Sequence, residues 1–197
     1  MQSVWTSEAA TTNTISNTVQ KTFMKFTIEK TMEVLHQTPD TLIRLTTGLS
    51  PFWTGATEGG DTWSVYDVVG HLLHGEKTDW VSRIGIILAA AEDNHFTPFD
   101  RFAQFESSKG KSLDTLLGEF KQMRHRNLEY VQSLGITEAD LSKTGIHPTF
   151  GSVTLRQLLS TWAVHDLDHI AQIARIMAFQ YKEEVGPWSE FLRIVRS

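Results

Sequence analysis

Two histidines, His165 and His169, stand four residues apart in the stretch WAVHDLDHIAQIARI. Side chains at this spacing share one face of a helix, so both ring nitrogens can converge on a single metal ion, as in HExxH proteins. The alternative is a pair of partly buried histidines satisfied by hydrogen bonds, since burying an unpaired imidazole is costly. Spacing alone leaves the two interpretations evenly balanced. The stripe that carries the histidines otherwise consists of Leu158, Trp162, Ile173 and Ile176.

A third ligand would have to come from another helix, and the segment VVGHLLHGE offers His71 and His74. Helical periodicity does not choose between them, because neither lies at the centre of the apolar face of this segment. One exposed histidine and one that lines a neighbouring helix is a competing interpretation. The remaining histidines are expected to lie outside a metal site: His125 in solvent within the basic run RHR, His36 beside a kink, His95 in a loop, and His147 in a loop that could overhang a pocket.

Acidic side chains close to these histidines could assist a metal site. Asp166 and Asp168 alternate with the histidine pair and could orient a ligand ring, although we expect at least one of them to be solvated on the helix surface. Glu76 could act as a base near the mouth of a site, but a solvated helix face is the preferred interpretation.

The composition restricts the chemistry further. The chain has no cysteine, so a metal would be held by histidine and carboxylate groups. The net charge of −5, without a basic stripe, argues against a nucleic-acid partner. The first residues lack a basic and apolar export signal, and no run reaches the roughly 20 apolar residues of a membrane span. We therefore expect a cytoplasmic protein without a membrane partner.

Helical periodicity organises most of the chain into four long segments. The first, 23–48, contains Pro39 and is expected to form one kinked helix or two in series. Strand alternation is absent, and a short helix is expected after Pro187. These features predict an all-α fold, a four-helix bundle over residues 23–197, preceded by a polar extension over residues 1–22. The other three long helices are expected at 64–92, 112–135 and 154–181, with Ser64, Ser112 and Thr154 as their N-caps.

The segments SVYDVVGHLLHGEKTDW and TLRQLLSTWAVHDLDHIAQIARIMAFQY resemble the DinB-like superfamily, in particular its YfiT-like branch. The resemblance extends over roughly residues 25–190. It implies a bundle of up-down-down-up type with one histidine ligand from the second helix and an HxxxH pair from the fourth. It thereby selects His71, His165 and His169 as metal ligands; His74 is not a ligand position of the family, although it could lie near enough to substitute.

The resemblance also implies an activity. Three imidazoles would leave a divalent metal (Zn, Ni or Fe) with open positions, which suits catalysis. Some relatives are described as metal-dependent hydrolases, and others transfer a low-molecular-weight thiol such as bacillithiol or mycothiol to small electrophiles. A non-catalytic metal- or ligand-binding protein is the alternative. A homodimer is expected from the family and from apolar residues that one core would leave uncovered, namely Ile86, Ile87 and Phe179.

Overall fold

The computed structural model describes residues 24–196, so the predicted extension over residues 1–22 lies outside the described part of the chain. Helices account for most of it, as the sequence predicts. The α-helices are α1 (Ile28–Thr46), α2 (Pro51–Thr54), α3 (Val65–Thr78), α4 (Trp80–Ala89), α5 (Ala103–Ser108), α6 (Leu113–Ser133) and α7 (Leu155–Phe179). The 3-10 helices are η1 (Asp140–Ser142), η2 (Gly186–Glu190) and η3 (Arg193–Val195), and the strands are β1 (Thr144–His147) and β2 (Gly151–Thr154).

Polar caps fix where the long helices begin. The Ser64 hydroxyl accepts from the Asp67 amide and the Asp67 carboxylate accepts from the Ser64 amide, which makes a capping box at the start of α3. Thr154 and Gln157 form the same device at the start of α7. Each box satisfies backbone groups that an isolated helix end would leave without partners. The predicted starts of these two helices are therefore confirmed.

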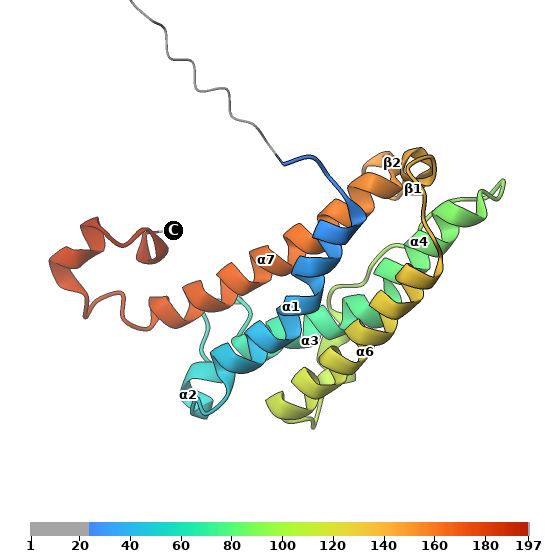
Figure 1. Cartoon of the computed structure of the whole chain (residues 1–197). Coiled ribbons are helices and arrows are strands. Elements are labelled where there is room, and N and C mark those ends of the chain that lie inside the picture. Colours follow the sequence, from blue (N-terminus) through green and yellow to red (C-terminus); the bar gives the residue numbers. More distant parts are fainter. Residues whose placement is uncertain (1–23, 197) are drawn as a thin grey trace, which may run out of the picture.

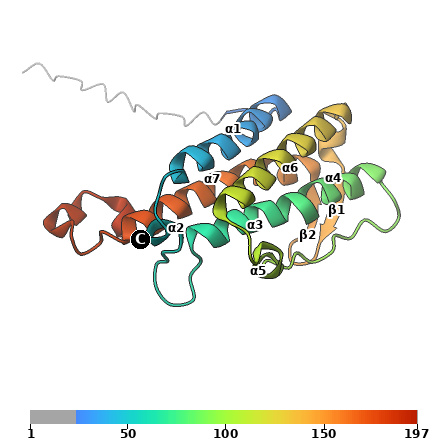
Figure 2. The ribbon, with the colours of Figure 1, turned by 90° about the horizontal axis from the view of Figure 1, so that it is seen from below.

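The long helices form a bundle of up-down-down-up type. In Figure 1, α1 and α7 run away from the hairpin end, whereas α3, α4 and α6 run toward it. Helix α1 packs on α6 and α7, and α3 packs on the same two helices from the opposite side. The short helix α5 lies against α3, as the view from below shows (Figure 2). The predicted four-helix bundle is thus confirmed.

A layer of polar side chains separates two apolar cores inside this bundle. The core nearer the hairpin includes Leu35, Trp80, Leu128 and Trp162. The core at the other end includes Leu42, Leu73, Phe120, Ile173 and Ile176. Between them α3, α6 and α7 place polar side chains inward, and this polar layer consists of Glu76, Arg124, Asn127 and Asp166. The candidate metal centre lies beside this layer on the same helices.

Two local expectations from the sequence were wrong, the absence of strands and the undivided second helix. The loop after α6 contains an antiparallel hairpin, β1 with β2, and the backbone of Ile146 also exchanges hydrogen bonds with Asn94 and Phe96. The predicted second helix is divided at Asp79, whose ψ of −72° departs from helical geometry, into α3 and α4. Of the two alternatives for the first segment, the single helix is the correct one, because α1 is continuous through Pro39. The short C-terminal helix is also present, as the 3-10 helix η2, which includes Pro187, and it is followed by η3.

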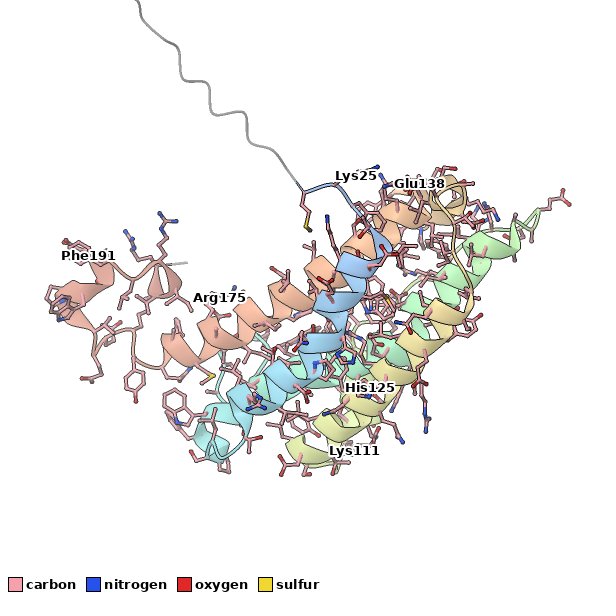
Figure 3. All side chains as sticks on the ribbon, in the orientation of Figure 1. Lys25, Lys111, His125, Glu138, Arg175 and Phe191 are labelled. Carbon is pink, nitrogen blue, oxygen red and sulfur yellow. The ribbon has the colours of Figure 1, made fainter. Side chains whose placement is uncertain are left out.

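The surface gives limited support to the predicted homodimer. Ile87 is fully buried in the monomer, and Ile86 and Phe179 are half-buried, so the apolar residues on which the prediction rested are largely covered. Exposed apolar side chains, among them Trp188 and Phe191, gather instead in the C-terminal segment after α7. Figure 3 shows Phe191 beyond the end of that helix. Among the described residues, no helix is long and apolar enough to cross a membrane.

Candidate metal centre

Three histidines from two helices meet at one point. His71 comes from α3, and His165 and His169 come from successive turns of α7. The Nε2 atom of His165 lies 3.1 Å from Nε2 of His71 and 3.1 Å from Nε2 of His169. One ring nitrogen from each residue falls within 4.8 Å of the other two. The structure therefore brings together the three residues that the family resemblance selects.

The close approach of His71 to the α7 pair depends on packing around α3. His71 is buried, although the sequence did not place it at the centre of an apolar face. The preceding residue, Gly70, faces α5 so closely that an added Cβ would collide with Gln104 Oε1 and lie 2.6 Å from Ser108 Oγ. A glycine at this position lets α5 cover α3 beside the histidine.

Hydrogen bonds alone do not explain this convergence of imidazoles. A neutral imidazole carries one proton, so Nε2 of His165 cannot donate to one neighbour while it accepts from the other. The Nδ1 atoms of His71 and His165 are buried and have no hydrogen-bond partner, whereas Nδ1 of His169 lies 2.7 Å from Oε1 of Gln172. Imidazoles bound to one tetrahedral cation at about 2.0–2.1 Å would place their nitrogens about 3.3 Å apart. The observed spacing is close to that arrangement, and the donor set fits a divalent metal.

The rings are also held in the form that binds a metal. Burial, followed by the neighbouring imidazole of His169, lowers the pKa of His71 and that of His165 to about 3. Burial lowers the pKa of His169 as well, against the opposing effect of its hydrogen bond with Gln172. All three imidazoles are therefore neutral near pH 7, with lone pairs available for a cation.

Two hollows open onto the histidines. One of about 260 Å³ is lined by His71 and His165 together with Phe99, Arg101 and His147. The other, of about 560 Å³, is lined by His71 and His169, and Arg101 contributes to it too. The connection before α5 thus shapes the site through Phe99 and Arg101, and His147 borders it, as the sequence suggested for this histidine. The larger hollow is also lined by Trp63, Gln172, and the ion pair of Arg175 with Glu58.

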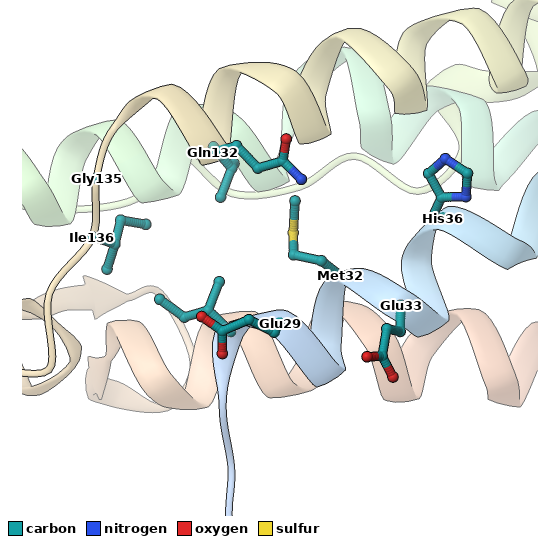
Figure 4. Close-up of a pocket in the computed structure, with 9 residues that line it drawn as sticks. Glu29, Met32, Glu33, His36, Gln132, Gly135 and Ile136 are labelled. Atoms are coloured by element: carbon teal, nitrogen blue, oxygen red, sulfur yellow. The ribbon is translucent and has the colours of Figure 1, made fainter.

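Another hollow of comparable size lies between α1 and α6 and lacks such chemistry. Met32, Gln132 and Ile136 line this cleft of about 520 Å³ (Figure 4). Its single histidine, His36, is exposed and stacks on His125 with ring centroids 5.4 Å apart. Among the described residues, only the cluster of His71, His165 and His169 gathers three groups that could hold a metal ion.

The remaining histidines lie apart from this cluster. His74 is half-buried and packs against Phe99, with ring centroids 5.2 Å apart, so it does not substitute for His71 in this arrangement. His125 is half-buried rather than free in solvent, and His95 is exposed and pairs with Asp93. Neither is near the three converging rings.

The acidic residues differ most from the sequence interpretation. Glu76 is not on a solvated face or at the mouth: it is 3% exposed and accepts hydrogen bonds from Arg124, Asn127 and Trp162. Asp166 is fully buried and paired with Arg124, and no hydrogen bond joins it to a histidine ring. Asp168 is exposed, as expected for at least one of the two aspartates.

Two functional residues escaped the sequence reasoning. Within residues 24–196, Gln172, one turn after His169, is the only side chain outside the cluster that hydrogen-bonds to one of its rings, and an i,i+3 relation to His169 was the available signal. Asp79 borders the smaller hollow; burial raises its pKa to about 6 although Arg83 opposes the shift. A carboxylate with a raised pKa beside a candidate metal site is suited to proton transfer.

Comparison with known proteins agrees with this geometry. A four-helix bundle with three converging imidazoles defines a class of metal-site proteins built on facing helices. The family description of the DinB superfamily matches residues 34–173, and the chain belongs to that superfamily. The structure is similar to that of YfiT from Bacillus subtilis, described as a probable metal-dependent hydrolase with an unusual four-helix bundle topology. The TM-score is 0.65 at 22% identity, over 80% of this chain and 89% of YfiT. No curated protein matches the sequence.

Proposed function

We propose that His71, His165 and His169 hold one divalent cation and that the protein is a metal-dependent hydrolase of a small molecule. The observation that carries the proposal is the convergence of three neutral imidazole nitrogens at the junction of two hollows. Three protein ligands leave coordination positions open, which distinguishes a catalytic site from a closed structural one. The description of YfiT as a probable metal-dependent hydrolase supports the hydrolytic class.

The bound cation would supply Lewis acidity, which lowers the pKa of a coordinated water or polarises a carbonyl or phosphoryl oxygen. Zinc, nickel and iron all suit an all-imidazole donor set. The residues of the chain would do the rest. Gln172 holds the ring of His169 through Nδ1, and Asp79 lies at the smaller hollow, where its carboxylate can accept a proton.

Transfer of a low-molecular-weight thiol is the second candidate activity. It is favoured by the absence of cysteine, because the nucleophilic sulfur would then arrive with the substrate. The hollow beside His169 presents Arg101, which suits an anionic group on such a thiol, whereas Arg175 is already paired with Glu58. The homodimer and the cytoplasmic location stay predictions of the sequence, as does the division into an extension and a bundle domain.

Elemental analysis and turnover assays on purified variants test the proposal. We expect His71→Ala, His165→Ala and His169→Ala each to lose most bound metal, while His74→Ala, the matched control on the same helix, retains it. Added Zn²⁺ should raise the unfolding free energy of the wild type by about 2.7 kcal/mol at a concentration of 100 times Kd, and should not stabilise the three variants.

The substrate class is decided by turnover. Metal-dependent cleavage of esters or amides without added thiol supports hydrolysis, whereas consumption of an electrophile only in the presence of a thiol supports the transferase. Stoichiometric metal without either activity would support a binding protein. Full metal content in the His71→Ala variant would contradict the three-histidine site.

A further inference from the structure

The three histidines converge only if α3 and α7 keep a fixed separation and rotation. Helix α3 supplies His71 and, slightly more than one turn later, Glu76; α7 supplies His165 and, directly after it, Asp166. Both carboxylates turn inward and bind one side chain of a third helix, Arg124 of α6. The two helices that carry the candidate ligands are therefore joined through a single guanidinium.

All four terminal N–H groups of Arg124 are used. Nη1 donates to Asp166 Oδ2 at 2.5 Å and Nη2 donates to Asp166 Oδ1 at 3.0 Å, which is a bidentate pair. Nη2 also donates to Glu76 Oε1 at 2.8 Å. The remaining N–H of Nη1 donates to the backbone carbonyl of Leu35 at 2.8 Å. Arg124 is fully buried, so these bonds have no competition from solvent.

The Leu35 carbonyl is available because of Pro39. In an α-helix this carbonyl would accept from the amide four residues later, but a proline at that position has no N–H. Helix α1 continues through Pro39, and the guanidinium takes the free acceptor. Arg124, which belongs to α6, thus binds groups on each of the other three long helices, α1, α3 and α7.

Aromatic packing carries this arrangement to the histidines. Glu76 Oε1 also accepts from Nε1 of Trp162 at 2.9 Å, and Asn127 Nδ2 donates to Glu76 Oε2 at 2.8 Å. Trp162 stacks on Trp80 at a centroid distance of 5.8 Å, and the ring of Trp80 meets that of His165 edge to face at 5.2 Å. A continuous set of contacts therefore joins the guanidinium to a candidate ligand.

We propose that Arg124 is a positioning residue of the metal site: by binding Glu76 and Asp166 at once, it sets the spacing of α3 and α7 at which His71 meets His165 and His169. This inference rests on the proposed metal-binding function. A buried ion cluster is weak evidence for a role in stability, because well-packed apolar side chains can replace such clusters without loss. Its specific effect is to fix how the helices are placed.

Metal affinity measured on folded, metal-free variants tests the inference. Arg124→Lys keeps the charge but has no planar fork, so it cannot bind both carboxylates and the Leu35 carbonyl together. We expect it to bind Zn²⁺ about 10- to 100-fold more weakly in competition with a chromophoric chelator. The visible absorption of bound Co²⁺, which reports ligand geometry, should also shift. Leu42→Ala is the matched control, since it weakens the apolar core farther from the hairpin and removes none of the hydrogen bonds of Arg124.

Each outcome of this experiment either supports or overturns the proposed role of Arg124. Weaker binding and an altered Co²⁺ spectrum in Arg124→Lys, with wild-type behaviour in Leu42→Ala at equal or lower stability, supports the inference. Wild-type affinity and spectrum in Arg124→Lys overturns it and leaves the three-histidine site standing, as does an equal loss of affinity in Leu42→Ala. Absence of Co²⁺ binding by the wild type overturns both the proposed function and this inference. If Arg124→Lys does not fold, Glu76→Gln, which keeps the shape of the side chain, is read by the same criteria.

Discussion

The two polar clusters inside this bundle satisfy their atoms in opposite ways. In the polar layer, Arg124 places four N–H groups on protein acceptors and Glu76 receives bonds from three side chains. Among the three histidines, two Nδ1 atoms are buried without partners and the Nε2 atoms face one another. Apart from Arg124 Nε, which is buried without a partner, the polar groups of the first cluster are satisfied by the protein itself. Under the proposed function a bound cation would satisfy the second cluster, and this difference distinguishes a structural cluster from a candidate binding site.

Electrostatics shows the same contrast. Burial alone would lower the pKa of the Arg124 guanidinium, but the carboxylates of Glu76 and Asp166 outweigh it and raise that pKa. Burial lowers the pKa of His71 and of His165, and the neighbouring imidazoles lower each further. In the polar layer the buried carboxylates thus stabilise the charged guanidinium. In the histidine cluster the imidazoles stay neutral, so their lone pairs are available to a metal ion.

The largest change in stability that tests this comparison should come from a substitution in the polar layer. Asp166→Ala would leave the guanidinium with one carboxylate in a site without solvent, so we expect unfolding free energy to fall by about 3–5 kcal/mol. His165→Ala, one residue away, should cost the metal-free protein about 1 kcal/mol. Urea denaturation of both variants measures the difference. Equal losses would mean that the two clusters contribute to folding in the same way.

A smaller effect is expected where the open cluster has its one orienting bond. Gln172→Leu removes the acceptor for Nδ1 of His169 but keeps the volume of the side chain. We expect Zn²⁺ affinity to fall about 10- to 100-fold, with little change in the stability of the metal-free protein. Isothermal titration with Zn²⁺ measures the affinity. Unchanged affinity would show that packing alone orients the ring.

The smallest effect concerns how the unfolding free energy depends on pH. In the metal-free protein the pKa of His165 is about 3, whereas that of a histidine in an unfolded chain is about 6.5. Between these values the unfolded chain binds more protons, so stability falls as pH drops from about 6.5 toward 3. Asp79 acts oppositely, since its raised pKa of about 6 favours the folded state as pH falls through that value. The contributions of His165 and Asp79 to the pH dependence of stability therefore have opposite signs.

We expect His165→Ala to lose stability less steeply than the wild type across that pH range, by up to about 1.4 kcal/mol per pH unit. Urea denaturation at pH 7, 6 and 5, which covers about 1.5 units of this window, measures the slopes. Asp79 is intact in both proteins, so its contribution cancels in the comparison. Parallel curves would show that His165 is not held neutral in the folded state.

The helical frame and the histidine pair were predictable because both depend on local spacing. Capping residues such as Ser64 and Thr154 mark helix starts with a chemistry readable over four residues, and the i,i+4 spacing of His165 and His169 fixes their common face. His71 required the family resemblance, since the rings that pack around it, Trp63 and Phe99, come from connections outside its own helix.

The polar layer could not be predicted in the same way. Glu76 and Arg124 have the composition of solvated helix positions, and only their meeting across three helices makes burial favourable. The hairpin was missed because its four-residue strands are too short for a clear alternation. They are stabilised by backbone pairing with the connection at Asn94 and Phe96, which lies far away in the sequence.

Pro39 and Arg124 depend on each other. The proline leaves the Leu35 carbonyl in α1 without an amide donor, and Arg124 of α6 donates a hydrogen bond to that carbonyl. Loss of the arginine would leave that carbonyl unsatisfied unless an amide returned to position 39. A substitution of Pro39 should therefore act as a suppressor of damage at Arg124, and the two positions should change together when homologues diverge.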